Sequence, residues 1–331
     1  MNNPSTKTEI ATLLAKVEQV RGSLNATVLG QEQLIGDLLV AILAGGHVLL
    51  EGLPGLGKTL LVRSLGQGLG LAFTRIQFTP DLMPTDVTGT TLVDEVGGKR
   101  TFRFQPGPIF GGLVLADEIN RATPKTQSSL LEAMQEGSVT IAGETHRLPQ
   151  PFHVIATQNP IELEGTYPLP EAQLDRFLFK LEVRTPSVEA MVRILAGTTS
   201  VAIAVASARL AQEDLLRLQH CVREVLCGNH LLQFTAELIA ATHPDSEQAS
   251  EKTRRFVRYG ASARAGQAIV LGAKARALLA GRAAVTREDL VAGLLPALRH
   301  RVLLGYEAEA VGTRVADLLE DWVQAADRRV R

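Results

Sequence analysis

The sequence predicts an α/β domain built on a parallel sheet and, after it, a second domain made of helices. Short apolar runs alternate with helical stretches up to Pro186, and a glycine-rich turn joins one of these runs to a helix. Beyond Pro186 the chain is mainly helical in composition. We therefore expect an α/β domain over residues 24–186 and a helical domain with a C-terminal helix over 187–331. Residues 1–23 carry apolar side chains at helical spacing and predict a leading helix or arm.

Each expected strand is a short apolar run followed by polar or glycine residues. Because helical stretches separate the runs, the strands are expected to be parallel. The predicted strands are residues 47–51, 74–78, 113–117, 153–157 and 177–183. The helices expected after the sheet are residues 213–226, 232–242, 262–280 and 286–303.

Two predicted β-hairpins interrupt this alternation. The first covers residues 90–105 around a Gly-Gly pair, and the second covers residues 138–148 around Gly143 and Glu144. Two interpretations stay open. In the first, which a family resemblance described below implies, the hairpins project from the domain and move with the state of a bound ligand. In the second, they are decorations with Phe102 and Phe104 packed against the sheet.

Composition limits the classes of partner and compartment. The chain has 331 residues, with 34 Lys and Arg against 35 Asp and Glu, so its formal charge of −1 favours neither nucleic acid nor a membrane surface. The longest apolar stretch, residues 38–50, is interrupted by glycines and a histidine, and no secretory signal opens the sequence. Cys221 and Cys227 are expected to face different sides of one helix, which disfavours a disulfide or a metal pair. They indicate buried thiols in a reducing, cytoplasmic compartment.

A glycine-rich motif of the form G-x-x-x-x-G-K-S/T follows the first predicted strand and precedes a helix. Its backbone N–H groups can surround phosphates at the helix N-terminus, where the helix dipole favours an anion. Lys58 is expected to reach the β- and γ-phosphates of ATP, and the Thr59 hydroxyl to bind Mg²⁺. An ordinary glycine-rich turn would not explain this Lys-Thr pair. The residues expected to contact the nucleotide are Gly52, Pro54, Gly55, Leu56, Gly57, Lys58, Thr59 and Leu60.

An acidic pair, Asp117 and Glu118, ends the predicted strand 113–117 in the manner of a Walker B motif. Ligands bind at the carboxyl edge of open α/β sheets, which is where this pair is expected. Asp117 would hold Mg²⁺ through water, and Glu118 would polarise the attacking water as a general base. Such a pair can also cap the following helix, but its place after a complete phosphate loop favours catalysis.

Several long segments resemble the MoxR family of AAA+ ATPases, and the resemblance covers most of residues 24–305. The resemblance implies an α/β P-loop AAA+ domain, with a parallel sheet flanked by helices and with β-hairpin inserts, followed by an all-α lid domain. ATP is then expected at the junction of the two. The segments that carry the resemblance are residues 45–52, 110–122, 127–136, 156–160 and 167–177.

The resemblance also implies roles for polar residues outside the two motifs. Asn159 is similar to sensor 1, which hydrogen-bonds the lytic water or γ-phosphate; an Asn-Pro turn is the alternative. Arg176 is similar to an arginine finger that reaches a neighbouring subunit's ATP, against the alternative of a surface Asp-Arg pair. Arg264 is similar to sensor 2, although the preceding Ala263 stands where the family commonly has proline. Arg121 is either a further phosphate-sensing or interface arginine, or a solvated one.

The family resemblance implies that ATP hydrolysis to ADP and phosphate in a ring, a homohexamer, drives remodelling, maturation or metal-cofactor insertion of a client protein. It also implies a von Willebrand factor A domain protein as partner, with no direct contact to nucleic acid or membrane. The alternatives are the AAA+ motor subunit of a metal chelatase, a scaffold that binds ATP without turnover, and a nucleic-acid remodeller.

Overall fold

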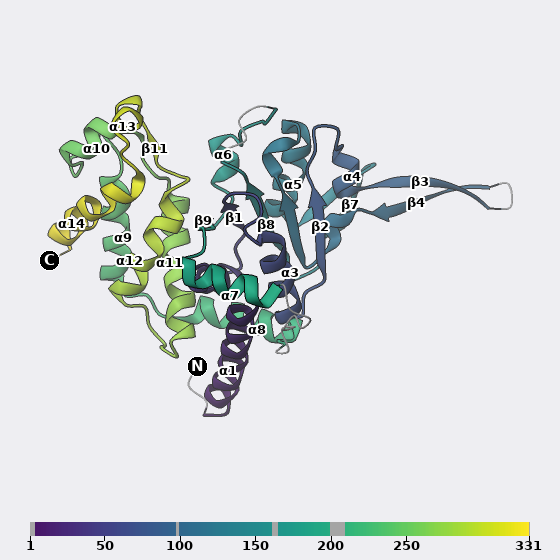
Figure 1. Cartoon of the computed structure of the whole chain (residues 1–331), viewed down its shortest axis with the longest axis horizontal. Helices are drawn as coiled ribbons and strands as arrows, with labels where there is room; N and C mark the ends of the chain where they lie inside the picture. Colours follow the sequence, from purple (N-terminus) through teal and green to yellow (C-terminus); the bar gives the residue numbers. More distant parts are fainter. Residues whose placement is uncertain (1–3, 97–98, 161–164, 199–208, 331) are drawn as a thin grey trace.

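A five-stranded parallel sheet forms the centre of the first part of the chain (Figure 1). The computed structural model describes residues 4–96, 99–160, 165–198 and 209–330. The strand order is β2-β5-β8-β1-β9, and every neighbouring pair is parallel. All five predicted strands are confirmed, with ends shifted by no more than two residues. The strands are β1 (Val48–Glu51), β2 (Phe73–Gln77), β5 (Leu113–Asp117), β8 (His153–Gln158) and β9 (Phe179–Glu182).

One face of the sheet shares an apolar core with the N-terminal helices α1 (Pro4–Thr27), α2 (Glu32–Leu43) and α3 (Lys58–Gly68). α1 is a packed helix and not a loose arm, because Val20 and Leu24 are buried in this core. The helix also continues past its predicted end at residue 23. Apolar spacing identified α1, but the sequence did not reveal what it packs against.

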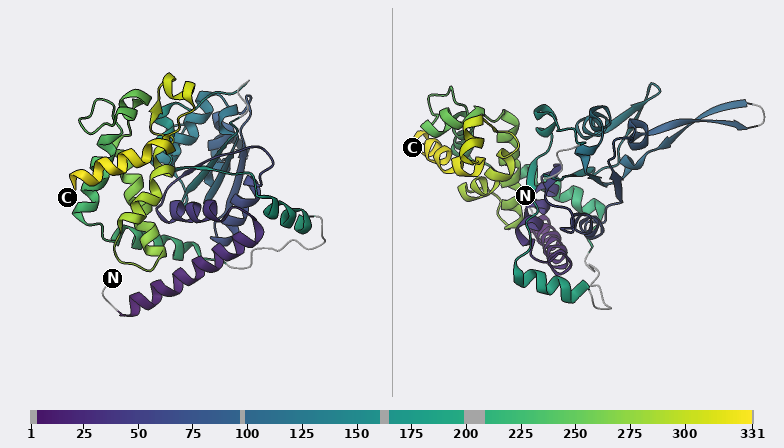
Figure 2. Two further views of the ribbon diagram at one scale, coloured as in Figure 1. Left: turned by 60° about the vertical axis from the view of Figure 1, so that its left-hand side comes forward. Right: turned by 45° about the horizontal axis from the view of Figure 1, so that its top comes forward.

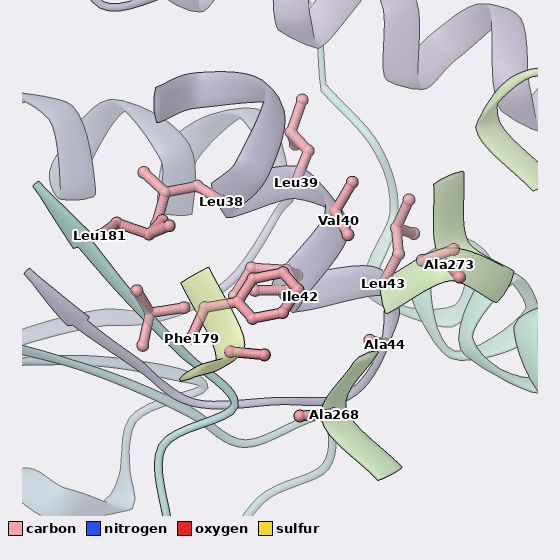
Figure 3. Close-up of a cluster of buried hydrophobic side chains, with 14 of the residues drawn as sticks. Leu38, Leu39, Val40, Ile42, Leu43, Ala44, Phe179, Leu181, Ala268 and Ala273 are labelled. Carbon is pink, nitrogen blue, oxygen red and sulfur yellow. The ribbon is translucent and has the colours of Figure 1, made fainter. Parts of the chain in front are cut away.

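The same core continues into the second part of the chain. Figure 3 shows α2 side chains meeting Phe179 and Leu181 of β9, with Ala268 and Ala273 of α11 (Ala263–Leu279) beside them. Gly272 of α11 permits this approach, since a Cβ atom there would lie 2.6 Å from the Phe179 ring. The sheet and α11 are therefore packed directly against each other, although they lie far apart in the sequence.

The opposite face of the sheet has its own core, formed with α4 (Pro84–Thr88), η1 (Pro108–Phe110) and α5 (Pro124–Glu136). The 3-10 helix η2 (Ile119–Arg121) follows β5 directly. Burial on both faces explains why residues 113–116 of β5 read as an uninterrupted apolar run in the sequence before Asp117 ends the strand.

Helices dominate after β9, as the composition predicted. α8 (Gln212–Glu224) packs against α1, α2 and α11, and a short antiparallel pair, β10 (Val257–Tyr259) with β11 (Leu303–Leu304), lies among the later helices. Trp322 of the last helix is fully buried and donates a hydrogen bond to the Thr253 hydroxyl at 2.9 Å. The remaining elements are α6 (Glu171–Leu174), α7 (Val188–Thr198), α9 (Asn229–Ala241), α10 (Glu251–Phe256), α12 (Arg287–Leu298), α13 (Tyr306–Val311), η3 (Val315–Leu318) and α14 (Leu319–Arg329).

Both predicted hairpins are present. β3 (Gly89–Val96) and β4 (Lys99–Pro106) form a ribbon that extends away from the body of the molecule (Figures 1 and 2). Its predicted Gly-Gly turn lies outside the described residues. The second hairpin pairs β6 (Ser138–Ile141) with β7 (Glu144–Arg147). It turns at Ala142 and Gly143, one residue earlier than predicted.

The two phenylalanines of the long hairpin have different surroundings. Phe104 stacks on His146 of the second hairpin, with ring centroids 3.8 Å apart. Phe102 is 77% exposed. The interpretation that both rings are packed is therefore wrong for Phe102, because the outer part of a two-stranded ribbon has no layer beneath it.

Two expectations about the cysteines need correction. Cys221 lies in α8, but Cys227 lies beyond the end of that helix, so they do not share one helix. Both thiols are free and half-buried rather than buried, and burial raises the pKa of each. In the described part of the chain, no helix combines the length and apolarity that crossing a membrane requires.

Candidate active site

The phosphate loop connects β1 to the N-terminus of α3. Gly55 and Gly57 have φ angles of +81° and +75°, which glycine adopts without strain, so the chain can curl around the start of the helix. The Lys58 ammonium donates a hydrogen bond to the carbonyl of Gly52 at 2.6 Å and thus lies across the loop. A helix N-terminus with a lysine folded over it is suited to bind phosphate.

The acidic pair at the end of β5 is fixed by β8. The Thr157 hydroxyl donates to Asp117 Oδ1 at 2.7 Å and accepts the Glu118 backbone N–H at 2.8 Å. Glu118 has a φ of +56°, in the left-handed region that non-glycine residues rarely adopt. Backbone strain of this kind is concentrated at functional sites.

Two polar side chains on β2 contact this pair, and the sequence analysis missed both. Arg75 donates to Asp117 Oδ2 from Nη2 at 2.7 Å and from Nε at 3.1 Å. Gln77 donates to Glu118 Oε2 at 2.8 Å. The sequence offered one signal for them, which is that they lie two residues apart on a predicted strand and so share one of its faces. It does not show that this strand lies next to the strand that carries the acidic pair.

The phosphate loop and the acidic pair line one hollow of about 400 Å³. Asn159 reaches it from the end of β8 and is itself buried. Gly52 and Leu56, which were also expected at the nucleotide, are not among its lining residues. The lining residues are Pro54, Gly55, Gly57, Lys58, Thr59, Leu60, Arg75, Asp117, Glu118 and Asn159.

The donor atoms in this hollow suit Mg²⁺. Thr59 and Asp117 offer a hydroxyl and a carboxylate, which are the hard oxygen ligands that Mg²⁺ prefers. The guanidinium of Arg75 on Asp117 shows that this carboxylate accommodates a cation. No group of three or more His, Cys, Asp or Glu residues able to hold a metal occurs in the described parts of the chain. Any Mg²⁺ here would therefore share its coordination with phosphates and water, which is its usual arrangement in nucleotide sites.

Arg121 also contacts the acidic pair. Its Nη1 lies 3.2 Å from Glu118 Oε2, and its side chain is 42% exposed. Arg121 thus contacts a residue that lines the hollow without lining it itself, and both interpretations of its role remain predictions.

Arg176 and Arg264 line a different hollow, of about 440 Å³, between the end of α6 and the start of α11. Arg264 Nη1 lies 3.7 Å from Asp175 Oδ2, and the buried Arg301 donates to Asp175 Oδ1 at 2.6 Å. Neither Arg176 nor Arg264 is among the residues that line the hollow beside the phosphate loop. The structure brings these two arginines together and apart from the chain's own phosphate loop.

Comparison with known proteins agrees with this geometry. The model of the ATPase family associated with various cellular activities (AAA) matches residues 47–179, and the AAA lid domain model matches residues 250–322. Chaperone MoxR1 of Mycobacterium tuberculosis is 44% identical over 283 residues, which cover 86% of this chain and 74% of that protein. Protein MoxR of Paracoccus denitrificans is 33% identical over 309 residues, covering 88% and 89%. This chain belongs to the MoxR family of AAA+ ATPases.

Other relatives match this MoxR-family chain over nearly its whole length. The uncharacterized protein YeaC of Bacillus subtilis is 43% identical over 305 residues and covers 91% of both chains. A crystal structure of a presumed ATPase from Cytophaga hutchinsonii superposes with a TM-score of 0.89 at 38% identity, covering 97% of both chains. The predicted family and fold are confirmed. ATP hydrolysis is the general kind of reaction in this family.

Proposed function

We propose that this protein binds Mg-ATP in the hollow beside the phosphate loop and hydrolyses it to ADP and phosphate. The observation that carries the proposal is the convergence of three segments on one hollow: the phosphate loop, the acidic pair after β5, and Asn159 after β8. Each segment lies at the carboxyl end of a strand, which is the edge of the sheet where open α/β folds bind ligands.

Each residue in the hollow has a distinct proposed role. Lys58 contacts the β- and γ-phosphates, and Thr59 and Asp117 hold Mg²⁺, which neutralises phosphate charge when bound. Glu118 accepts a proton from the attacking water, and Asn159 orients that water or the γ-phosphate. The left-handed backbone and the Thr157 hydrogen bond support the role of Glu118, because they fix where its side chain starts.

The hollow lined by Arg176 and Arg264 supports the proposal that the protein assembles into a ring. We propose that Arg176 and Arg264 contact the ATP of a neighbouring subunit in a homohexamer, since both line a hollow away from this chain's own phosphate loop. The buried ion pair of Arg301 with Asp175 fixes the backbone beside Arg176 to the lid. An arginine that completes a neighbour's site couples nucleotide binding to assembly.

The proposed biological role is the remodelling, maturation or metal-cofactor loading of a client protein in the cytoplasm, together with a von Willebrand factor A domain partner. The chaperone name of the mycobacterial relative supports a protein client. The exposed Phe102 on the projecting hairpin offers a surface that a client could contact.

A mixing experiment tests the enzyme and the ring together. Lys58→Ala should abolish productive ATP binding, and Arg176→Ala should bind ATP but lose about 10³- to 10⁵-fold in turnover. Mixed rings place an intact phosphate loop beside an intact finger, so phosphate release should partly return. Undiminished turnover by Arg176→Ala alone would refute the finger assignment, and wild-type ATP affinity in Lys58→Ala would refute the phosphate-loop assignment.

A further inference from the structure

Arg75 has a position that the proposed mechanism does not use. It lies on β2, the edge strand next to β5, and it shares one face of that strand with Gln77 because side chains alternate along a strand. The register pairs Gln77 with Asp117, so the Arg75 guanidinium extends along the sheet edge towards the same carboxylate. It lines the hollow beside the phosphate loop.

Both carboxylate oxygens of Asp117 have protein donors. Oδ1 accepts the Thr157 hydroxyl, and Oδ2 accepts two N–H groups of Arg75. Asp117 is almost fully buried, with 10% of its side chain exposed, whereas 44% of the Arg75 side chain is exposed. Of the two oxygens, Oδ2 is therefore the one whose partner can withdraw towards water.

We propose that Arg75 is a built-in counter-cation that positions Asp117 and competes with Mg²⁺ for Oδ2. A charged hydrogen bond to Oδ2 satisfies the buried carboxylate and must be broken or rearranged before that oxygen can serve a metal ion or its bound water. Two cations close to one carboxylate also repel each other. Arg75 can withdraw from Asp117 without losing every partner, because its Nη2 also donates to Gln77 Oε1 at 2.6 Å. This inference rests on the proposed nucleotide site.

The test measures metal binding and not turnover. Mn²⁺ is titrated into full-length protein saturated with ADP, and bound Mn²⁺ is followed by the loss of its free electron-paramagnetic-resonance signal. Arg75→Gln should lower the half-saturating Mn²⁺ concentration about tenfold, which is the size expected for loss of one charged hydrogen bond. Arg75→Lys, which keeps a positive charge near Asp117, should tighten Mn²⁺ binding less than Arg75→Gln does, because a cation still opposes the metal ion. The matched control is Arg63→Gln, because Arg63 is an exposed arginine on α3 that lies over the Phe73 ring.

Two results would overturn the inference. Mn²⁺ binding by Arg75→Gln that is no tighter than in the wild type would mean that Arg75 only holds Asp117 in place. Equal tightening in Arg75→Lys and Arg75→Gln would mean that charge is not the cause. ADP affinity in EDTA is measured first for each protein, so a wild type that binds no ADP would contradict the proposed function separately. A wild type that binds ADP but no Mn²⁺ would contradict the proposed metal site itself, whereas either of the two results above, in a protein whose wild type binds both ADP and Mn²⁺, would overturn the role of Arg75 alone.

Discussion

Replacing Asp175 with asparagine should destabilise the protein far more than removing an exposed ion pair. Arg301 has only 4% of its side chain exposed, and its guanidinium donates to the Asp175 carboxylate at 2.6 Å. Burial lowers the pKa of Arg301, and the hydrogen bond and charge of Asp175 oppose that fall. The amide keeps the size of the side chain but removes the charge that compensates the guanidinium.

The expected loss follows from these contacts. Removing one partner of a buried ion pair costs about 3–5 kcal/mol. We expect the lower end, about 3 kcal/mol, because Arg301 keeps backbone carbonyl acceptors and 20% of the Asp175 side chain is exposed. Urea unfolding followed by the fluorescence of the single tryptophan, Trp322, measures the loss in the lid, where that residue is buried.

The matched control is Asp327→Asn. The Asp327 carboxylate accepts two hydrogen bonds from one arginine, Arg287, whereas the Asp175 carboxylate accepts one from Arg301, but both side chains of the control pair are more than 40% exposed. An exposed pair contributes less than about 1 kcal/mol, so this variant should be nearly as stable as the wild type. If Asp175→Asn loses no more stability than Asp327→Asn, the reasoning about the buried guanidinium is refuted.

Three further predictions follow from the same structure. ATP with Mg²⁺ should convert micromolar protein from small species to rings in sedimentation, and a protein that stays monomeric would contradict the ring. Arg264→Ala should lower turnover while isolated subunits keep their ATP affinity, because Arg264 lines a hollow away from the phosphate loop; weaker ATP binding by the monomer would contradict this. Burial lowers the pKa of His153 from 6.5 to about 4, so its contribution to stability is present above pH 6.5 and is lost as the pH falls towards 4. Urea unfolding should show a loss of about 2 kcal/mol at pH 5 from this residue, and a His153→Gln variant with the same pH profile as the wild type would exclude it.

Most of the fold could be predicted because its signals are local. The strands were recognised as short runs rich in apolar residues, and β5 is apolar up to Asp117 since both of its faces are buried. Long-range packing could not be predicted from local patterns, and the contact of Gly272 with Phe179, which joins the lid to the sheet, is an example. The sequence also left the surroundings of Phe102 open, since strand alternation does not show whether a second layer covers the ribbon.

The residues of the candidate site also fall into two groups, those that local sequence predicts and those that depend on long-range packing. The phosphate loop and the acidic pair were predictable because each has its own spacing next to a strand. Arg75 and Gln77 were not, because they reach the site only through the β2–β5 pairing. The separation of Arg264 from the phosphate-loop hollow likewise depends on how the lid packs, which no motif records.

Glu118→Gln tests the central claim most directly. The amide resembles the carboxylate in size and can still contact Gln77, but it cannot accept a proton from water. ATP affinity, measured by equilibrium titration with Mg²⁺, should stay within about threefold of the wild type, while phosphate release should fall by about 10²- to 10⁴-fold. Phosphate release at the wild-type rate with ATP affinity unchanged would contradict the account, because hydrolysis would then not depend on the carboxylate at the end of β5.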